Sequence, residues 1–266
     1  MKNEVISIIT CTYNSEKYLK KALESIENQT YRHIEHIIND SYSTDSTLDI
    51  IQEYCERNQD RYNIKFIQSE PKGVGNALNV ATREATGDII HYLHSDDYYL
   101  NNDVLEKVAF QFTENPDLVW LTGNYLVELW GRRIVIPQTH LLRANPDMAL
   151  SVMNFISHEN TFMRRECVQM YGGFNESHSD VVEYSLWLNM IKDHKPLIVD
   201  DEFTVFIIHK GSTSTGNPLK FSKAIMRAFH TQKKEKTFPL IGSYADQRLS
   251  DQFKLMVKKV ANLNFL

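Results

Sequence analysis

The first hundred residues alternate between short β-favouring runs and amphipathic helical segments, and this alternation constrains the fold more than any other feature. Each run is rich in β-branched or aromatic residues and gives way to polar turn residues, as buried strands do. The predicted strands are Val5–Thr10, His33–Asn39, Ile64–Gln68 and Ile89–Leu93, and the predicted helices are Ser15–Asn28, a segment containing Leu48, Ile51 and Tyr54, and Asn76–Thr86. The pattern favours an α/β fold with a mainly parallel, Rossmann-like sheet, in which ligands bind beyond the carboxyl ends of the strands.

The pattern becomes less regular after Asp103. The expected elements there are a helix over Val104–Phe112, a strand over Leu118–Thr122, a hairpin over Tyr125–Ile136, a helix over Met148–Phe155, a strand over His158–Arg164, a turn at Gly172 and Gly173, a helix over Val182–Ile191 and a strand over Phe203–Ile208. An amphipathic segment, Tyr244–Leu263, follows a polar, basic stretch.

Carboxylates follow two of the predicted parallel strands. Asp40 ends the second, and the stretch GDIIHYLHSDDYY delivers Asp96 and Asp97 at the end of the fourth. Adjacent carboxylates repel, so such a pair is either solvated in a turn or neutralised by a hard cation that prefers oxygen ligands. A carboxylate after an early strand commonly binds a ribose or base. With Glu183 at the start of a later helix, these acids suggest a nucleotide diphosphate ligand and a divalent ion.

Composition and charge exclude several classes of protein. The net charge of -5 argues against nucleic acid as the main partner, because phosphate binding needs a broad basic surface. The three cysteines lack the spacing of a zinc site or a disulfide framework, which favours a reducing cytoplasm. We expect no signal peptide and no membrane span, so that any membrane contact is peripheral, at the inner face. There is neither GxGxxG nor GxxxxGK[ST], so a metal ion would have to replace glycine amides at the phosphates.

Five segments, in order, resemble the successive motifs of family 2 inverting glycosyltransferases of the GT-A fold, as found in bacterial polysaccharide and cell-surface glycan synthesis. They are SIITCTYNSEKYLKKALESIENQTY, IINDSYSTDSTLDII, EPKGVGNALNVATREATGDIIHYLHSDDYY, ISHENTFMRREC and YGGFNESHSDVVEYSLWLNM. The resemblance covers roughly residues 4 to 212. We expect one GT-A domain over residues 1–215, with a nucleotide-binding half over 1–103 and an acceptor half over 104–215, and a helical extension over 216–266.

The resemblance implies roles for particular residues. Asp97 would touch a Mg²⁺ or Mn²⁺ ion that bridges the diphosphate, and Asp96 would approach the ribose or donor sugar, with Ser95 in place of the first acid of the DxD-type signature. Such an ion neutralises charge that develops on the departing diphosphate. The residues implied to bind the nucleotide sugar are Thr10, Tyr13, Glu16, Asp40, Lys72, Gly73, Asn79 and Asp96.

Glu183 matches the family position of the general base, which takes the proton from an acceptor hydroxyl. Asp180 is the rival base, and a carboxylate that complements the helix macrodipole is the structural alternative. His158 and Asn160 align with the strand near the acceptor and sugar, although His158 is as readily a structural residue. Trp187 would stack on a sugar or be buried in its helix. His91 and His94 are expected to pack rather than bind a ligand.

The expected activity is metal-dependent, inverting transfer of a hexose from a nucleotide diphosphate donor, most often UDP-linked, to a saccharide or lipid-linked saccharide. Two departures keep alternatives open: the usual DGSSTDGT turn is DSYSTDST, and the usual acid pair is Val182 and Glu183. One alternative is a nucleotide-sugar-binding protein with impaired catalysis. The other is a sugar nucleotidyltransferase, which Thr10–Ser15 disfavours because it lacks a Gly-rich basic loop. The C-terminal segment is compatible with packing, a homodimer or membrane contact.

Overall fold

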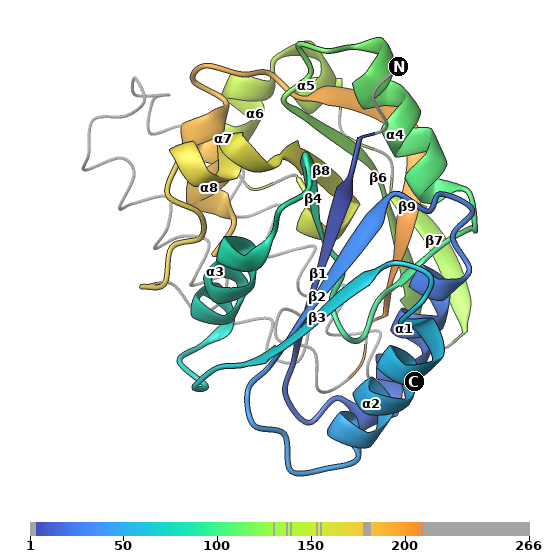
Figure 1. The fold of residues 1–266 in the computed structure, drawn as a ribbon. Coiled ribbons are helices and arrows are strands. Elements are labelled where there is room, and N and C mark those ends of the chain that lie inside the picture. Colours follow the sequence, from blue (N-terminus) through green and yellow to red (C-terminus); the bar gives the residue numbers. More distant parts are fainter. Residues whose placement is uncertain are drawn as a thin grey trace, which may run out of the picture.

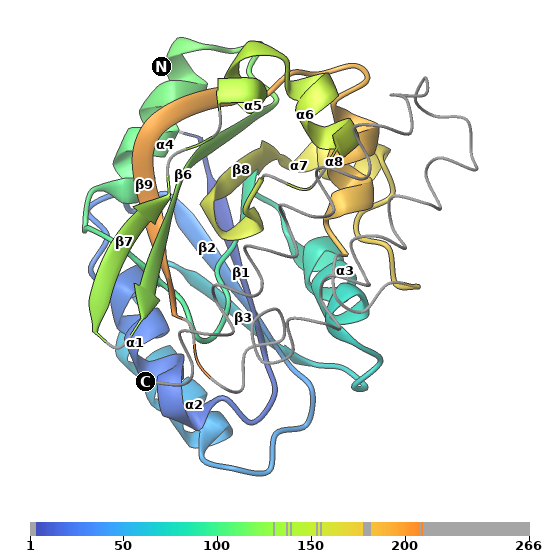
Figure 2. The ribbon, with the colours of Figure 1, turned by 180° about the vertical axis from the view of Figure 1, so that it is seen from behind.

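The computed structural model describes residues 4–129, 131–136, 138, 140–152, 154, 156–177, 182–207 and 209. The predicted extension over 216–266 lies outside the described residues, as do the boundary at residue 215, the segment Tyr244–Leu263 and the proposed dimer or membrane contact. Figures 1 and 2 show a central sheet with helices packed on both of its faces. No helix among the described residues is long and apolar enough to cross a membrane.

The amino-terminal half forms the predicted parallel sheet. Its strands lie in the order β3-β2-β1-β4, and every neighbouring pair is parallel. The elements are β1 (Ile6–Thr12), α1 (Glu16–Glu27), β2 (Ile34–Asp40), α2 (Thr47–Asn58), β3 (Asn63–Gln68), α3 (Val74–Glu84) and β4 (Ile89–Tyr92). The four strands and three helices predicted from alternation are therefore confirmed, with boundaries that differ by a few residues.

The second half continues the same nine-stranded sheet, with antiparallel strands added to the parallel ones. β4 pairs antiparallel with β8, β8 antiparallel with β6, and β6 parallel with β9. The elements are β5 (Tyr98–Tyr99), α4 (Val104–Glu114), β6 (Trp120–Leu129), β7 (Arg132–Ile136), α5 (His140–Ala144), α6 (Pro146–Val152), β8 (Thr161–Arg164), α7 (Arg165–Met170), α8 (Tyr184–Met190) and β9 (Leu197–Ile207). The predicted strand over 158–164 begins with a 3-10 turn, His158–Asn160, and β5, α5 and α7 were not predicted.

Two hydrophobic cores lie on opposite faces of the sheet. Successive residues of a strand point to opposite faces, so Ile8 enters the core with α1, α2 and α4, whereas Ile9 enters the core with α3, α6, α7 and α8. Figure 1 shows these two sets of helices on either side of the strands. Because both faces are covered, β1, β2 and β4 are buried along almost their whole length, and their polar residues, such as Ser7 and Glu35, are hydrogen-bonded inside the sheet. β3, at the edge of the sheet, is partly exposed.

A buried carboxylate joins β2 to the chain just before β4. Glu35 Oε1 accepts hydrogen bonds from Ser7 Oγ at 2.6 Å and from the backbone N–H groups of Thr86 at 2.6 Å and Gly87 at 2.8 Å, and its Oε2 accepts one from Thr86 Oγ1 at 2.8 Å. A Cβ on Gly87 would lie 2.7 Å from the carbonyl oxygen of Val5, so this close approach requires glycine. These hydrogen bonds hold the pKa of Glu35 below its ordinary value, although burial opposes them as the largest single influence.

We expect Glu35→Gln to lower the free energy of unfolding by about 2–3 kcal/mol at neutral pH, since an amide nitrogen would replace an acceptor that takes several hydrogen bonds. The folded-state pKa lies below the ordinary value of 4.5, so the wild-type advantage is present above pH 4.5 and is lost as the pH falls through the folded-state pKa. Urea unfolding over a descending pH series measures both effects. Glu166→Gln, on the exposed side of α7, is the matched control. Equal stabilities of Glu35→Gln and the control at neutral pH would contradict this assignment.

Candidate active site

The first part of the candidate site is the edge formed by the carboxyl ends of β1, β2 and β3. Strand register sets Thr12 beside Asp40 and Asp40 beside Gln68. The buried carboxylate of Asp40 accepts hydrogen bonds from Thr12 Oγ1 at 2.8 Å, Ser43 Oγ at 2.5 Å, Ser43 N at 2.9 Å and Gln68 Nε2 at 3.3 Å. Asp40 thus fixes the loop that follows β2, with its side chain engaged by protein donors.

Two aromatic rings border this edge. Tyr13 is 60% exposed and Tyr42 is 50% exposed, and each lies in a loop that follows a parallel strand. Tyr42 adopts a positive φ angle of 58°, and Asn14, which follows Tyr13, adopts one of 48°. The unusual DSYSTDST turn therefore keeps its hydrogen bonds to Asp40 and presents Tyr42 at the surface, available for stacking on a planar ligand.

Several other residues predicted to bind the nucleotide are engaged within the protein. Thr10 is buried, and its Oγ1 lies 3.0 Å from His36 Nε2. Glu16 Oε2 accepts a hydrogen bond from Ser46 N at 3.0 Å. Asn79 binds both backbone groups of Phe174 at 2.9 Å, which ties α3 to the segment after α7. Their contact with a donor remains a prediction.

Lys72 and Gly73 lie in the loop that leads into α3. Lys72 is exposed, and its backbone N–H donates to Glu70 O at 2.8 Å. Gly73 precedes the helix at φ 102°, a backbone conformation that favours glycine. The glycine thus sets the turn that presents Lys72 to solvent, and the contact of both residues with a donor remains a prediction.

The Asp96–Asp97 pair lies between β4 and β5, and its two carboxylates have different surroundings. Asp96 Oδ2 lies 2.9 Å from His209 Nε2, and the His209 ring packs on Tyr18 at 4.4 Å between ring centres. Asp97 is only 1% exposed. Its Oδ1 accepts a hydrogen bond from Ile207 N at 3.1 Å, whereas its buried Oδ2 has no partner among the described residues.

Burial raises the pKa of Asp97 well above its ordinary value, and the nearby charges of Asp96 and Glu159 raise it further. A divalent cation would relieve these costs, because it would give Oδ2 a partner and neutralise the adjacent carboxylates. The unpartnered Oδ2 of Asp97 and the carboxylate of Asp96 suit a divalent cation by their chemistry, although the ligand atoms of Asp96, Asp97 and His209 do not all lie within 4.8 Å of one another in this structure. Its identity as Mg²⁺ or Mn²⁺ remains a prediction, as does the assignment of Asp97 as its ligand.

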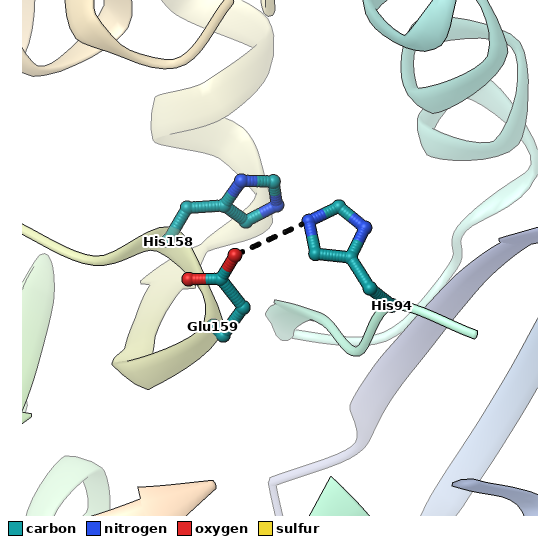
Figure 3. Close-up of side chains that lie close together, drawn as sticks. All are labelled: His94, His158 and Glu159. Carbon is teal, nitrogen blue, oxygen red and sulfur yellow. Dashed lines mark ion pairs between the residues drawn. The ribbon is translucent and has the colours of Figure 1, made fainter. Parts of the chain in front are cut away.

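A second group of potential ligands consists of His94, His158 and Glu159. One ligand atom of each lies within 4.8 Å of the other two, and this is the one such three-residue group found in the part of the chain that the structure describes. Figure 3 shows the three side chains pointing toward one another. His94 Nε2 lies 3.5 Å from Glu159 Oε1. The expectation that His94 only packs is therefore incomplete, because its ring faces a carboxylate.

Glu183 directly precedes α8 and is partly buried. Its Oε1 accepts a hydrogen bond from Asn154 Nδ2 at 2.9 Å, and its side chain makes no capping hydrogen bond to α8. Burial raises the pKa of Glu183 to about 7, and the charge of Glu159 adds to this increase. A carboxyl group with this pKa is suited to accept a proton near neutral pH. The rival base, Asp180, lies outside the described residues.

The remaining residues predicted near the acceptor are buried. Asn160 Oδ1 accepts hydrogen bonds from Phe203 N and Thr204 N, both at 3.1 Å, so it connects the 3-10 turn to β9. Trp187 is fully buried and stacks on Trp120 at 5.4 Å between ring centres. The structure thus favours the burial alternative for Trp187 over stacking on a sugar, because its helix turns this face into the core.

Tyr125, which the sequence did not indicate as a site residue, is affected by the charges of both the Asp96–Asp97 pair and Glu183. Burial raises the pKa of Tyr125 well above its ordinary value, and the charges of Glu159, Asp97, Glu183 and Asp96 all raise it further. The charges of four carboxylates from three regions of the sequence therefore act on the Tyr125 phenol. Sequence reasoning also missed Glu159, Asn154 and His209. Two of them had a weak signal in the sequence: Glu159 is adjacent to His158, a predicted site residue, and His209 follows the last strand.

Comparison with solved structures establishes the type of fold. The fold is similar to that of residues 1–349 of TarS from Staphylococcus aureus in complex with UDP-GlcNAc, with a TM-score of 0.67, 22% identity and coverage of 92% of this chain and 70% of that one. It is also similar to the mannosyltransferase PcManGT from Pyrobaculum calidifontis in complex with GDP-Man and Mn²⁺, with a TM-score of 0.64, 17% identity and coverage of 100% and 82%. The chain thus has a glycosyltransferase fold of the GT-A type.

Sequence comparison establishes the family. The model of glycosyl transferase family 2 matches residues 7–171. The chain is 31% identical to the UDP-Glc:alpha-D-GlcNAc-diphosphoundecaprenol beta-1,3-glucosyltransferase WfaP of Escherichia coli, over 85% of this chain and 84% of that protein. The chain belongs to glycosyl transferase family 2 and is a glycosyltransferase.

Proposed function

We propose that this glycosyltransferase is metal-dependent and inverting, and that it moves a hexose from a UDP-sugar to a saccharide or lipid-linked saccharide in the synthesis of a cell-surface polysaccharide. The observation that carries this proposal is that the charges of Asp96, Asp97 and Glu183 all act on one buried side chain, Tyr125, and raise its pKa. It supports a single site in which a diphosphate-binding pair and a proton acceptor act on the same substrate.

In the proposed reaction Glu183 acts in its ionised form. It takes the proton of an acceptor hydroxyl as the oxygen attacks the anomeric carbon on the side opposite the nucleotide. A new carbon–oxygen bond forms while the bond to the diphosphate breaks, and the electron pair leaves with the nucleoside diphosphate. Asn154 orients the Glu183 carboxylate through its 2.9 Å hydrogen bond.

Asp96, Asp97 and His209 are the residues that would hold the cation beside the diphosphate. The bound ion supplies Lewis-acid stabilisation of the charge that develops on the leaving group. The exposed Tyr13 and Tyr42 rings, at the edge organised by Asp40, suit the planar base of the nucleotide.

The names of similar proteins support the choice of substrates. The name of the Escherichia coli relative specifies UDP-Glc as donor and a diphosphoundecaprenol-linked sugar as acceptor. The TarS structure was determined with UDP-GlcNAc, and the PcManGT structure with GDP-Man and Mn²⁺. A UDP-sugar and a lipid-linked saccharide are therefore the first substrates to test on this chain.

We expect kcat/KM for transfer to rise with pH through about 7, because burial raises the pKa of Glu183 to about 7 and only the ionised carboxylate accepts a proton. Below that pH the fraction of active enzyme should fall about tenfold for each unit of pH. Initial rates at a fixed Mn²⁺ concentration measure the profile. Asn154→Ala should shift its midpoint upward, since the hydrogen bond from Asn154 favours the ionised form. A rate that stays constant on crossing pH 7 would contradict the assignment of Glu183.

A further inference from the structure

We propose that His94, His158 and Glu159 form a binding site for a borderline divalent cation of the Zn²⁺ type, separate from the ion assigned to Asp96 and Asp97. The inference goes beyond the proposed function, because it concerns a second ion and needs neither donor nor acceptor. The cysteines do not indicate such a site. It arises instead where the loop after β4 meets the 3-10 turn before β8.

The geometry of the three side chains is close to that of a zinc site. Ligands of a tetrahedral Zn²⁺ ion lie about 2.0–2.2 Å from the metal, which places neighbouring donor atoms roughly 3.4 Å apart. His94 Nε2 and Glu159 Oε1 are 3.5 Å apart, and all three ligand atoms lie within 4.8 Å of one another. Small side-chain movements would thus bring three donors onto one ion and leave a fourth position open.

His158 is a buried histidine with a ring nitrogen that is suited to bind a metal ion. It is only 5% exposed, and its buried Nε2 has no hydrogen-bond partner among the described residues. Figure 3 shows its ring turned toward His94 and Glu159. Burial, followed by the neighbouring His94 and His91, lowers its pKa well below the ordinary value, so the imidazole is neutral and keeps a lone pair for a metal.

Protein groups outside the three ligands hold Glu159 in place. Ser157 Oγ donates a 2.6 Å hydrogen bond to Glu159 Oε2, which leaves Oε1 directed at His94. The backbone oxygen of Glu159 accepts hydrogen bonds from His91 Nε2 at 2.9 Å and Thr204 Oγ1 at 2.9 Å. This support is what an outer shell provides at a metal site, where it fixes the orientation of the ligands.

The type of donor separates this site from the diphosphate ion. Two imidazoles and one carboxylate suit Zn²⁺ and similar transition metals, whereas Mg²⁺ prefers carboxylates, water and phosphate oxygens. Glu159 lies close enough to Asp97 and Glu183 for its charge to raise the pKa of both. The charge of the second ion would therefore act on the carboxyl groups of both Asp97 and Glu183.

The test is calorimetric titration of the full chain with Zn²⁺, together with the visible spectrum of the Co²⁺-loaded protein, both without nucleotide. We expect a site of high affinity that gives a tetrahedral type of Co²⁺ absorption. His158→Ala and Glu159→Gln should each weaken binding more than tenfold, and Ser157→Ala, which keeps all three ligands, should weaken it about 10-fold to 100-fold. Circular dichroism melting in the absence of metal checks that each variant folds.

Two controls make the outcome specific. His33→Ala, at an exposed histidine distant in sequence, and Asp96→Asn, at the other proposed ion site, should both retain the wild-type affinity for Zn²⁺. The proposal is overturned if folded His158→Ala binds Zn²⁺ as tightly as the wild type, or if Asp96→Asn removes the site. Because no donor is present, either result leaves the proposed transfer activity untouched.

Discussion

We expect Glu183→Gln to lower kcat for sugar transfer by about 10²–10⁴-fold, the usual contribution of a general base, with little change in the affinity for the donor. The glutamine side chain keeps an oxygen for Asn154, whose Nδ2 lies 2.9 Å from Glu183 Oε1, so the local structure should survive. What is lost is the ability to accept the proton from the acceptor hydroxyl. Rates of nucleoside diphosphate release, and donor binding by calorimetry, measure the two quantities separately.

Glu166→Gln is the matched control for this substitution, because Glu166 is an exposed glutamate on α7 and no role is assigned to it. It should transfer sugar at the wild-type rate. If Glu183→Gln also keeps that rate, Glu183 is not the base. If the wild-type protein binds a donor but transfers nothing to any acceptor and hydrolyses nothing, the alternative of impaired catalysis is favoured.

The second large effect is expected at the Asp96–Asp97 pair. Asp97→Asn should reduce kcat/KM by about 100-fold or more, since Lewis-acid stabilisation of a leaving group contributes several kcal/mol and each 1.36 kcal/mol is a factor of ten. The fold should tolerate the change, because the asparagine oxygen can still accept the 3.1 Å hydrogen bond from Ile207 N. Asp96→Asn should likewise weaken the binding of the donor that depends on Mn²⁺.

Assays over a Mn²⁺ titration and after chelation measure this dependence. The control is Asp117→Asn, a substitution at an exposed aspartate in the loop before β6, which should leave the titration unchanged. Robust transfer in the presence of excess chelator would exclude the metal role. Wild-type Mn²⁺ dependence in Asp97→Asn but not in Asp96→Asn would restrict that role to Asp96.

The amino-terminal half of the fold was predictable because its signals are local. Runs such as Ile34–Asp40 are buried on both faces, and helices such as Glu16–Glu27 carry a clear apolar stripe. The second half depends on tertiary contacts. β5 has two residues, Tyr98–Tyr99, and forms a strand only because β9 pairs with it. Such an element carries no periodic signal in the sequence.

The candidate site divides in the same way. Asp96 and Asp97 were predictable because they follow a recognisable strand, and Glu183 because it matches a family position. The contact between His94 and Glu159 joins residues far apart in the sequence and exists only once β4 and β8 are paired. Burial, which raises the pKa of Glu183 to about 7, likewise belongs to the folded chain.

The measurement that tests the central claim most directly is calorimetric titration of the full chain with a series of nucleotide sugars, with and without Mn²⁺. The account predicts saturable binding of a UDP-sugar that requires the ion. Asp96→Asn should abolish this binding, and Asp117→Asn should preserve it. Failure to bind any nucleotide sugar, or equal binding in the absence of a divalent ion, would contradict it.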